Sequence, residues 1–137
     1  MLPNWDFDVI DANGRSGGLA SGWRLRVCRC ENLLSISSGL GLEVFVPDLG
    51  KILTILNVYG PYQDRVPFWD KVFNNPMLDG RDLILGGDLN FSLALAEVWG
   101  PRVVLDVLLN YFLNGLVQKE WLDINPVKVT PTWRNTR

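Results

Sequence analysis

Short apolar segments, some of them alternating with polar residues and all bounded by turn residues, dominate the first sixty positions of the chain. Such segments are typical of β-strands. Asn13-Gly14 is a strong hairpin signal, and the turn composition of 47–51 (PDLGK) suits a second hairpin. We therefore predict strands over 5–10 (WDFDVI), from Gly17-Gly18-Leu19-Ala20 onward, over 24–30 (RLRVCRC), over 41–46 (GLEVFV) and over 52–59 (ILTILNVY).

Helical spacing replaces this pattern in two later segments. The apolar residues Phe68, Trp69, Val72 and Phe73 predict one stripe on a helix over 64–75, which Asp64 can cap. A strand follows over 82–87. A second amphipathic helix is predicted over 103–117 from its apolar positions, which are Leu105, Leu108, Leu109, Phe112, Leu113 and Leu116. Strands that pair in hairpins with helices between them favour an α/β layered fold with mixed or antiparallel sheets.

Composition fits one globular domain over 1–137 and excludes a disordered or fibrous chain, since 47% of the residues are apolar and 20% are charged. Thirteen basic residues against fifteen acidic ones give a net charge of −2, so charge alone does not indicate nucleic-acid binding. The first residues lack a signal-peptide pattern, and no run of apolar residues reaches the length of a membrane span. We expect a soluble, intracellular protein.

Cys28 and Cys30 are the only cysteines, and the sequence contains no histidine. A Cys-x-Cys pair on a strand points both thiols to one face. Two ligands do not complete a zinc site, and the commonest metal ligand and general base is missing. We interpret the pair as two small, half-buried thiols in a reducing compartment, and no residue is assigned as a metal ligand.

The segment LILGGDLN carries an apolar strand directly to Asp88 and Asn90, and LNVYGPY delivers Tyr59 to the end of another strand. On extended backbone, Asp88 and Asn90 face the same side. Together they can orient a water and hold a phosphate oxygen, with room left by Gly86-Gly87. Both motifs are also compatible with local turn capping. Thr132-Trp133, near the end of the sequence, is also compatible with simple core packing.

The ordered set of SGGLASGW, LNVYGPY, LILGGDLNF, WGP and PTWRN resembles the endonuclease/exonuclease/phosphatase family over essentially the whole chain. The likeness is greatest to the endonuclease domain of plant non-LTR (LINE-type) retrotransposons. The resemblance implies a four-layer α/β sandwich, with mixed or antiparallel sheets inside and helices outside. It also implies Mg²⁺-dependent cleavage of DNA phosphodiesters.

Residue roles follow from the same resemblance. Asp88 and Asn90 match the Gly-Asp-x-Asn motif that handles the nucleophilic water and the phosphate, and Tyr59 matches a tyrosine near the scissile phosphate. Thr132 and Trp133 match a pair on the DNA-facing surface. These matches make Asp88, Asn90 and Tyr59 the candidate catalytic residues, and Thr132 and Trp133 the candidate substrate-binding residues.

Two parts of the family pattern have no counterpart in the sequence. The Gln-Glu-Thr-like segment with the metal-binding glutamate and the Ser-Asp-His motif are both missing, and the acids Asp6, Asp8 and Asp11 are more typical of solvated surface than of a metal site. We expect a partial domain at 1–137 that is inactive in DNA cleavage. The alternative is a non-catalytic α/β remnant or interaction module.

Overall fold

A computed structural model describes residues 3–12, 18–100 and 103–124. The chain divides into two compact units, Met1–Asn90 and Phe91–Arg137. Within the described ranges, no helix combines the length and the apolar character that crossing a membrane requires.

The first unit begins with an antiparallel hairpin formed by β1 (Trp5–Ile10) and β2 (Leu19–Arg24). Its register runs from Trp5 opposite Arg24 to Ile10 opposite Leu19. The predicted strand over 5–10 and its antiparallel partner are confirmed. The predicted turn residues Asn13 and Gly14 lie outside the described residues.

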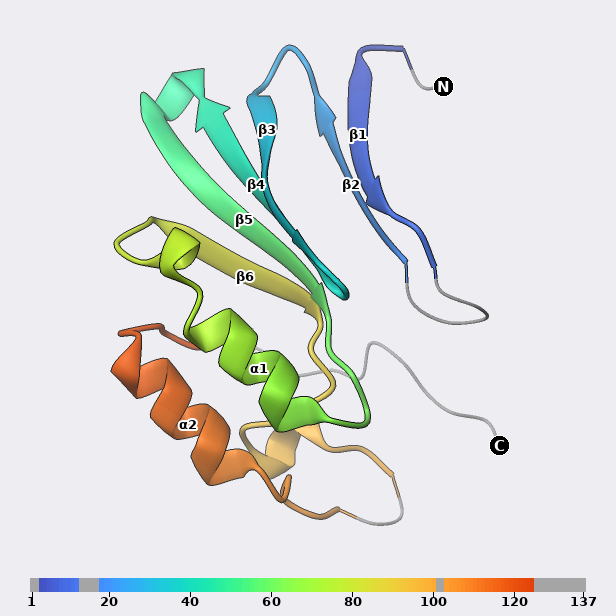
Figure 1. The fold of residues 1–137 in the computed structure, drawn as a ribbon, viewed down its shortest axis with the longest axis vertical. Coiled ribbons are helices and arrows are strands. Elements are labelled where there is room, and N and C mark those ends of the chain that lie inside the picture. The colour runs from blue at the N-terminus through green and yellow to red at the C-terminus, as the bar shows by residue number, and fades with distance from the viewer. Residues whose placement is uncertain (1–2, 13–17, 101–102, 125–137) are drawn as a thin grey trace. The chain divides into compact units, whose positions relative to one another are not determined.

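A four-stranded sheet in the order β3-β4-β5-β6 makes up most of the rest of this unit (Figure 1). Its strands are β3 (Arg29–Ile36), β4 (Gly39–Val46), β5 (Lys51–Tyr59) and β6 (Leu83–Asp88). β4 is antiparallel to both of its neighbours, β3 and β5, whereas β5 and β6 are parallel. The described chain is therefore a mixed α/β structure, as predicted, and the predicted hairpin of 41–46 and 52–59 is confirmed.

One predicted strand, 24–30, is wrong. β2 ends at Arg24, where the backbone N–H groups of Val27 and Cys28 donate to the Arg24 carbonyl at 2.9 and 3.2 Å and close a turn. β3 then starts at Arg29 and continues to Ile36. A register shift between Asn32 and Leu34 breaks its alternation, which explains why the pattern did not reveal it.

The parallel pair β5–β6 is joined by a crossover that contains α1 (Arg65–Phe73). The helix buries the predicted stripe of Phe68, Trp69, Val72 and Phe73. The predicted cap is wrong, because Asp64 has a φ of 51° and its side chain makes no capping hydrogen bond. An N-cap residue normally needs extended backbone to reach the first N–H groups. The described residues also include short 3₁₀ helices at Pro47–Leu49, Pro76–Leu78 and Leu95–Glu97.

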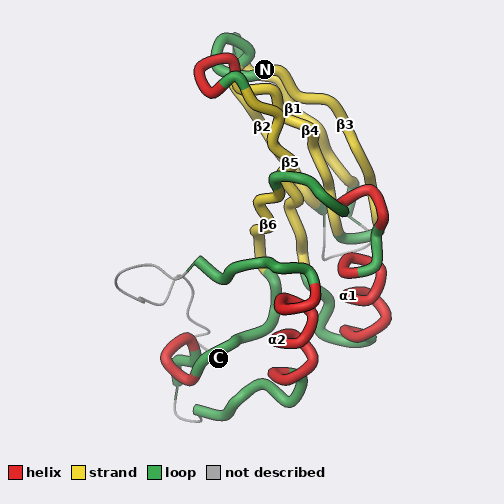
Figure 2. The backbone as a smooth tube through the Cα atoms, turned by 90° about the vertical axis from the view of Figure 1, so that its left-hand side faces the viewer, coloured by secondary structure: helices red, strands yellow, loops and turns green. Residues whose placement is uncertain are grey.

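The core of the first unit lies between the hairpin and one face of the four-stranded sheet. Leu40, Leu42 and Val44 of β4 are buried there, and the hairpin residues that pack against them are Ile10, Leu19 and Trp23. Figure 2 shows the backbone of the hairpin strands β1 and β2 next to that of β3 and β4. The opposite face carries the buried residues Thr54, Leu56 and Val58 of β5. Both faces of β5 therefore contribute to packing, which suits its near-continuous apolar sequence.

The second unit contains α2 (Leu109–Gln118), which starts later than the helix predicted over 103–117. The Asp106 carboxylate accepts from the Leu108 N–H at 2.9 Å, and the Asp106 carbonyl accepts from the Leu109 N–H at 3.0 Å. This local turn stands where the prediction had the beginning of the helix. Phe112 is fully buried and stacks on Phe91, with 4.0 Å between the ring centroids.

Candidate functional site

Tyr59 and Asp88 occupy paired positions at the carboxyl ends of β5 and β6. Parallel strands end at the same edge of a sheet, about 4.8 Å from their neighbours, so the two residues adjoin although α1 separates them in sequence. Both residues were predicted to lie at the ends of strands, and each is the last residue of its strand. Tyr59 is half-buried and Asp88 is exposed, so the carboxylate is accessible from solvent.

Asn90 lies two residues beyond β6, and its position differs from the prediction. Its φ of 52° is left-handed, so the extended backbone on which the same-side expectation rested does not continue through Asn90. The Asn90 side-chain nitrogen donates to the Gly60 carbonyl at 2.6 Å. In return, the Gly60 N–H donates to the Asp88 carbonyl at 2.7 Å. The loops after β5 and β6 are therefore bonded to each other in both directions.

Two glycines let these backbones approach so closely. A Cβ at Gly60 would overlap the carbonyl of Leu89, and a Cβ at Gly87 would overlap the carbonyl of Val58. Gly87 also has a φ of +126°, which disfavours any side chain. Room for a ligand was the predicted role of Gly86-Gly87, but Gly87 instead makes room for β5. At Gly86 a Cβ would meet nothing within 4 Å.

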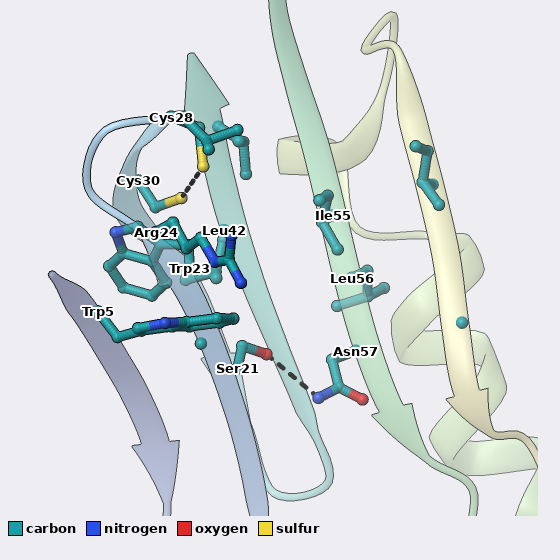
Figure 3. Close-up of a pocket in the computed structure, with 15 residues that line it drawn as sticks. Trp5, Ser21, Trp23, Arg24, Cys28, Cys30, Leu42, Ile55, Leu56 and Asn57 are labelled. Carbon is teal, nitrogen blue, oxygen red and sulfur yellow. Dashed lines mark hydrogen bonds between the residues drawn. The ribbon is translucent and has the colours of Figure 1, made fainter. Parts of the chain in front are cut away.

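Asn57, for which the sequence predicted no role, lies on the same face as Tyr59 and Asp88, because it is two residues before Tyr59 on β5. Its side-chain nitrogen donates to Ser21 Oγ at 3.2 Å and approaches the Ala20 carbonyl at 3.4 Å, so it ties β5 to β2 (Figure 3). The signal for it was a polar residue inside the otherwise apolar strand ILTILNVY. The N–H of Tyr59 donates to the Ser38 carbonyl at 2.9 Å, which fixes the end of β5.

A groove of about 550 Å³ opens beside Asn57, between the hairpin and the sheet. Its lining is mostly apolar and includes Trp5, Trp23, Leu42 and Ile55 (Figure 3). Arg24 lies over the Trp5 ring at 5.2 Å from its centroid, a cation–π contact at the rim. The groove therefore adjoins the polar strand-end residues but differs from them in chemistry.

The polar groups at this edge can serve as donors and acceptors, but they supply little anionic charge. Asp88 is the one carboxylate among Tyr59, Asp88 and Asn90. No cluster of three or more His, Cys, Asp or Glu that could hold a metal ion occurs in the described part of the chain. Mg²⁺ prefers octahedral oxygen ligands anchored by one or two carboxylates, together with substrate phosphate and water. The described residues of this edge alone do not make up a Mg²⁺ site.

The acids of the first hairpin do not alter that result. Asp8 accepts a 2.6 Å hydrogen bond from the Asn32 side chain, and Asp6 and Asp11 are exposed, as expected for solvated positions. Thr132 and Trp133, the predicted substrate-binding pair, lie outside the described residues.

Taken together, the ends of β5 and β6 present a phenol, a carboxylate and two mutually bonded loops. The phenol can donate a hydrogen bond to an anionic oxygen, and the carboxylate can accept one from a water. The cross-bonds hold both strand ends in fixed positions. No protein-family model matches this chain, and no curated protein shows a significant match to it.

Proposed function

We propose that this chain is part of a phosphodiesterase domain of the endonuclease/exonuclease/phosphatase kind, of the retrotransposon endonuclease type. The observation that carries the proposal is the register pairing of Tyr59 with Asp88 at one sheet edge. Those residues belong to the two motifs, LNVYGPY and GGDLN, on which the resemblance rests most. The mixed α/β architecture is compatible with a portion of the four-layer sandwich that the resemblance implies.

The proposed roles follow from the chemistry of each side chain. Asp88 accepts a hydrogen bond from a water and orients it toward phosphorus, while the Tyr59 hydroxyl donates to a phosphate oxygen. Asn90 acts mainly by position, because its amide holds the Gly60 carbonyl and thereby fixes the loop that follows Tyr59. Such fixed donors contribute to catalysis because they need no reorganisation during the reaction. Mg²⁺ and DNA are the cofactor and substrate that the resemblance implies.

We further propose that the 137-residue chain does not hydrolyse DNA by itself. Metal-assisted cleavage requires an ion that neutralises charge on the phosphate and a group that activates water. The described edge offers one carboxylate, and the sequence contains no histidine that could act as a base. Groups that act as one catalytic unit lose nearly all activity when members are missing.

Two measurements test the proposal. The first follows backbone amide resonances while a short DNA duplex is added in millimolar Mg²⁺, and we expect shifts at Tyr59–Gly60 and Asp88–Asn90 that Asp88→Ala reduces. Asp82→Ala is the matched control, since Asp82 is an exposed acid next to the opposite end of β6, paired at 3.8 Å with Lys51. Shifts that leave the β5–β6 edge unaffected contradict the proposed site.

The second measurement is nicking of supercoiled plasmid with Mg²⁺ or Mn²⁺. We expect no nicking above the level of the Asp88→Ala chain. Metal-dependent nicking that Asp88→Ala abolishes and Asp82→Ala retains would overturn the proposed inactivity and establish an active endonuclease.

The second candidate function, a non-catalytic interaction module, is favoured by the bond from Asn90 to the Gly60 carbonyl. This bond is the local capping that the alternative expects of the motif. On that reading, Asn90→Ala lowers stability and no residue at the edge affects DNA binding. The amide titration distinguishes the two candidates, because only the phosphodiesterase reading makes the response at Tyr59 depend on Asp88.

A further inference from the structure

The groove between the hairpin and the four-stranded sheet has the size of a small-molecule site. Its volume of about 550 Å³ lies within the range of about 300–1,000 Å³ that is typical of ligand pockets. Trp5 and Trp23 line it from the hairpin, and Ile55 of β5 and its register partner Ile84 of β6 line it from the sheet (Figure 3). Gly86 also lines it, and a Cβ there would meet nothing within 4 Å, so the groove is open at this position.

The groove is apolar apart from one charge and a few small polar groups. Among the described residues that line it, Arg24 alone is charged. The Arg24 guanidinium lies 5.2 Å from the centroid of the Trp5 ring, and Figure 3 shows the side chain extending along that ring toward the groove. Within the described residues, no carboxylate forms an ion pair with Arg24. The lining therefore presents one positive charge that no described acid neutralises by contact.

Neighbouring groups that could carry negative charge do not alter this balance. Burial, the hydrogen bond with Cys28 and the charges of Cys28 and Asp6 raise the pKa of Cys30 to about 12, so the Cys30 thiol in the lining is neutral at pH 7. Asp6 itself is exposed and lies outside the lining. Its carboxylate accepts from the N–H of Phe7 at 2.9 Å. An anion that enters the groove therefore meets a net positive charge at Arg24.

We propose that this groove binds a small aromatic monocarboxylate, with its ring between the hairpin and the β5–β6 face and its carboxylate on Arg24. A flat ring suits a space that is bounded by two layers of strands and lined by aromatic and aliphatic side chains. The planar guanidinium binds a carboxylate through two parallel hydrogen bonds. Charge complementarity distinguishes this ligand from a neutral molecule, which leaves Arg24 unpaired, and from a cation, which Arg24 repels.

Titration of the chain with three naphthalene derivatives of similar shape tests the role of charge. The probes are naphthoate, the neutral naphthamide and the cationic naphthylmethylammonium, with affinity measured by calorimetry and the site located by backbone amide resonances. We expect naphthoate to saturate at one molecule per chain and to shift the resonances of Arg24, Ile55 and Gly86. Naphthamide should bind about tenfold more weakly, because it lacks the hydrogen bonds between two charged groups, and the cation should bind more weakly still.

Variants separate the charge of Arg24 from the space in the groove. Arg24→Gln should weaken naphthoate binding about tenfold and leave naphthamide binding unchanged. Arg26→Gln is the matched control, since Arg26 is an exposed arginine in the turn after β2 that does not line the groove. Gly86→Leu fills the open position and should abolish the binding of both probes. Circular dichroism establishes that each variant is folded, and the comparison of the three probes on the unmodified chain decides the matter even if a variant is not.

Four outcomes would overturn the proposal. They are equal affinity for naphthoate and naphthamide, binding that does not saturate, an Arg26→Gln variant weakened as much as Arg24→Gln, and ligand-free shifts of the groove resonances with protein concentration. The last outcome would mean that a second copy of the chain covers the groove. None of them bears on the proposed phosphodiesterase function, which rests on Tyr59, Asp88 and Asn90.

Discussion

Replacing Gly60 by alanine tests whether close contact between the loops after β5 and β6 is what maintains the strand-end site. An added Cβ would overlap the backbone carbonyl of Leu89, which cannot rotate away as a side chain can. Relief requires the two loops to separate. Separation also strains the hydrogen bonds that link Gly60 with Asp88 and with Asn90, of 2.7 and 2.6 Å.

The expected magnitude follows from these two effects. Overpacking of this kind costs about 1–3 kcal/mol, and each weakened hydrogen bond costs about 1 kcal/mol. We therefore expect Gly60→Ala to lower the free energy of unfolding by about 3–5 kcal/mol. Gly86→Ala is the matched control, because a Cβ there meets nothing within 4 Å. It should be neutral or stabilise by about 0.5 kcal/mol, through lower entropy of the unfolded chain.

Urea denaturation followed by tryptophan fluorescence measures both variants. With a slope of about 2 kcal/mol per molar urea, the Gly60→Ala midpoint should fall by about 1.5–2.5 M relative to that of the unmodified chain. A Gly60→Ala midpoint equal to that of Gly86→Ala would refute the reasoning. It would mean that the loops accommodate a methyl group without separating.

Three further predictions concern other parts of the chain. Phe112→Ala removes a fully buried ring that stacks on Phe91, and it should destabilise the chain by about 3–5 kcal/mol in the same urea assay. A loss of stability below about 1 kcal/mol would contradict that packing. Apolar side chains such as Val9 and Ile84, which are 59% and 51% exposed, should bind a hydrophobic dye and cause the chains to associate, as measured by sedimentation. A monodisperse monomer that binds no dye would count against this prediction. The pKa of the Cys30 thiol is raised from 9.0 to about 12, so the folded chain favours the neutral thiol. The stability that the neutral Cys30 thiol contributes is fully present below pH 9 and is lost as the pH rises toward 12. Between pH 8 and 11 the unmodified chain should therefore lose more stability than Cys30→Ser, and equal losses would refute the assignment.

Much of the sheet was predictable because its strands are apolar and bounded by turn residues. The strands ending at Tyr59 and Asp88 and the turn at 47–51 all have strong local signals, and the structure has them. The turn after Arg24 has no such signal, since its residues are arginine, leucine and valine. The strand that follows was hidden by its register shift, which disrupts the period of two. Local patterns do not report features that depend on a neighbouring strand.

The candidate site was predictable for similar reasons, and only in part. Two motifs that each end an apolar strand are enough to expect Tyr59 and Asp88 at a common edge. The role of Gly60 required knowledge of the backbone that crosses it, which no sequence window contains. The left-handed backbone at Asn90 was also missed, because the Asp-x-Asn spacing is compatible with an extended chain as well as a turn. Spacing indicates which residues meet, but not how the chain bends between them.

The parallel pairing of β5 with β6 also sets the order in which the fold can form. The hairpins β1–β2, β3–β4 and β4–β5 join neighbouring segments, and each can close early at low entropic cost. Pairing of β5 with β6 must wait until α1 and its connections have been arranged, because every contact between these strands spans the whole crossover. The residues at the β5–β6 edge therefore come together late in folding. Substitutions there should accelerate unfolding while leaving the folding rate nearly unchanged.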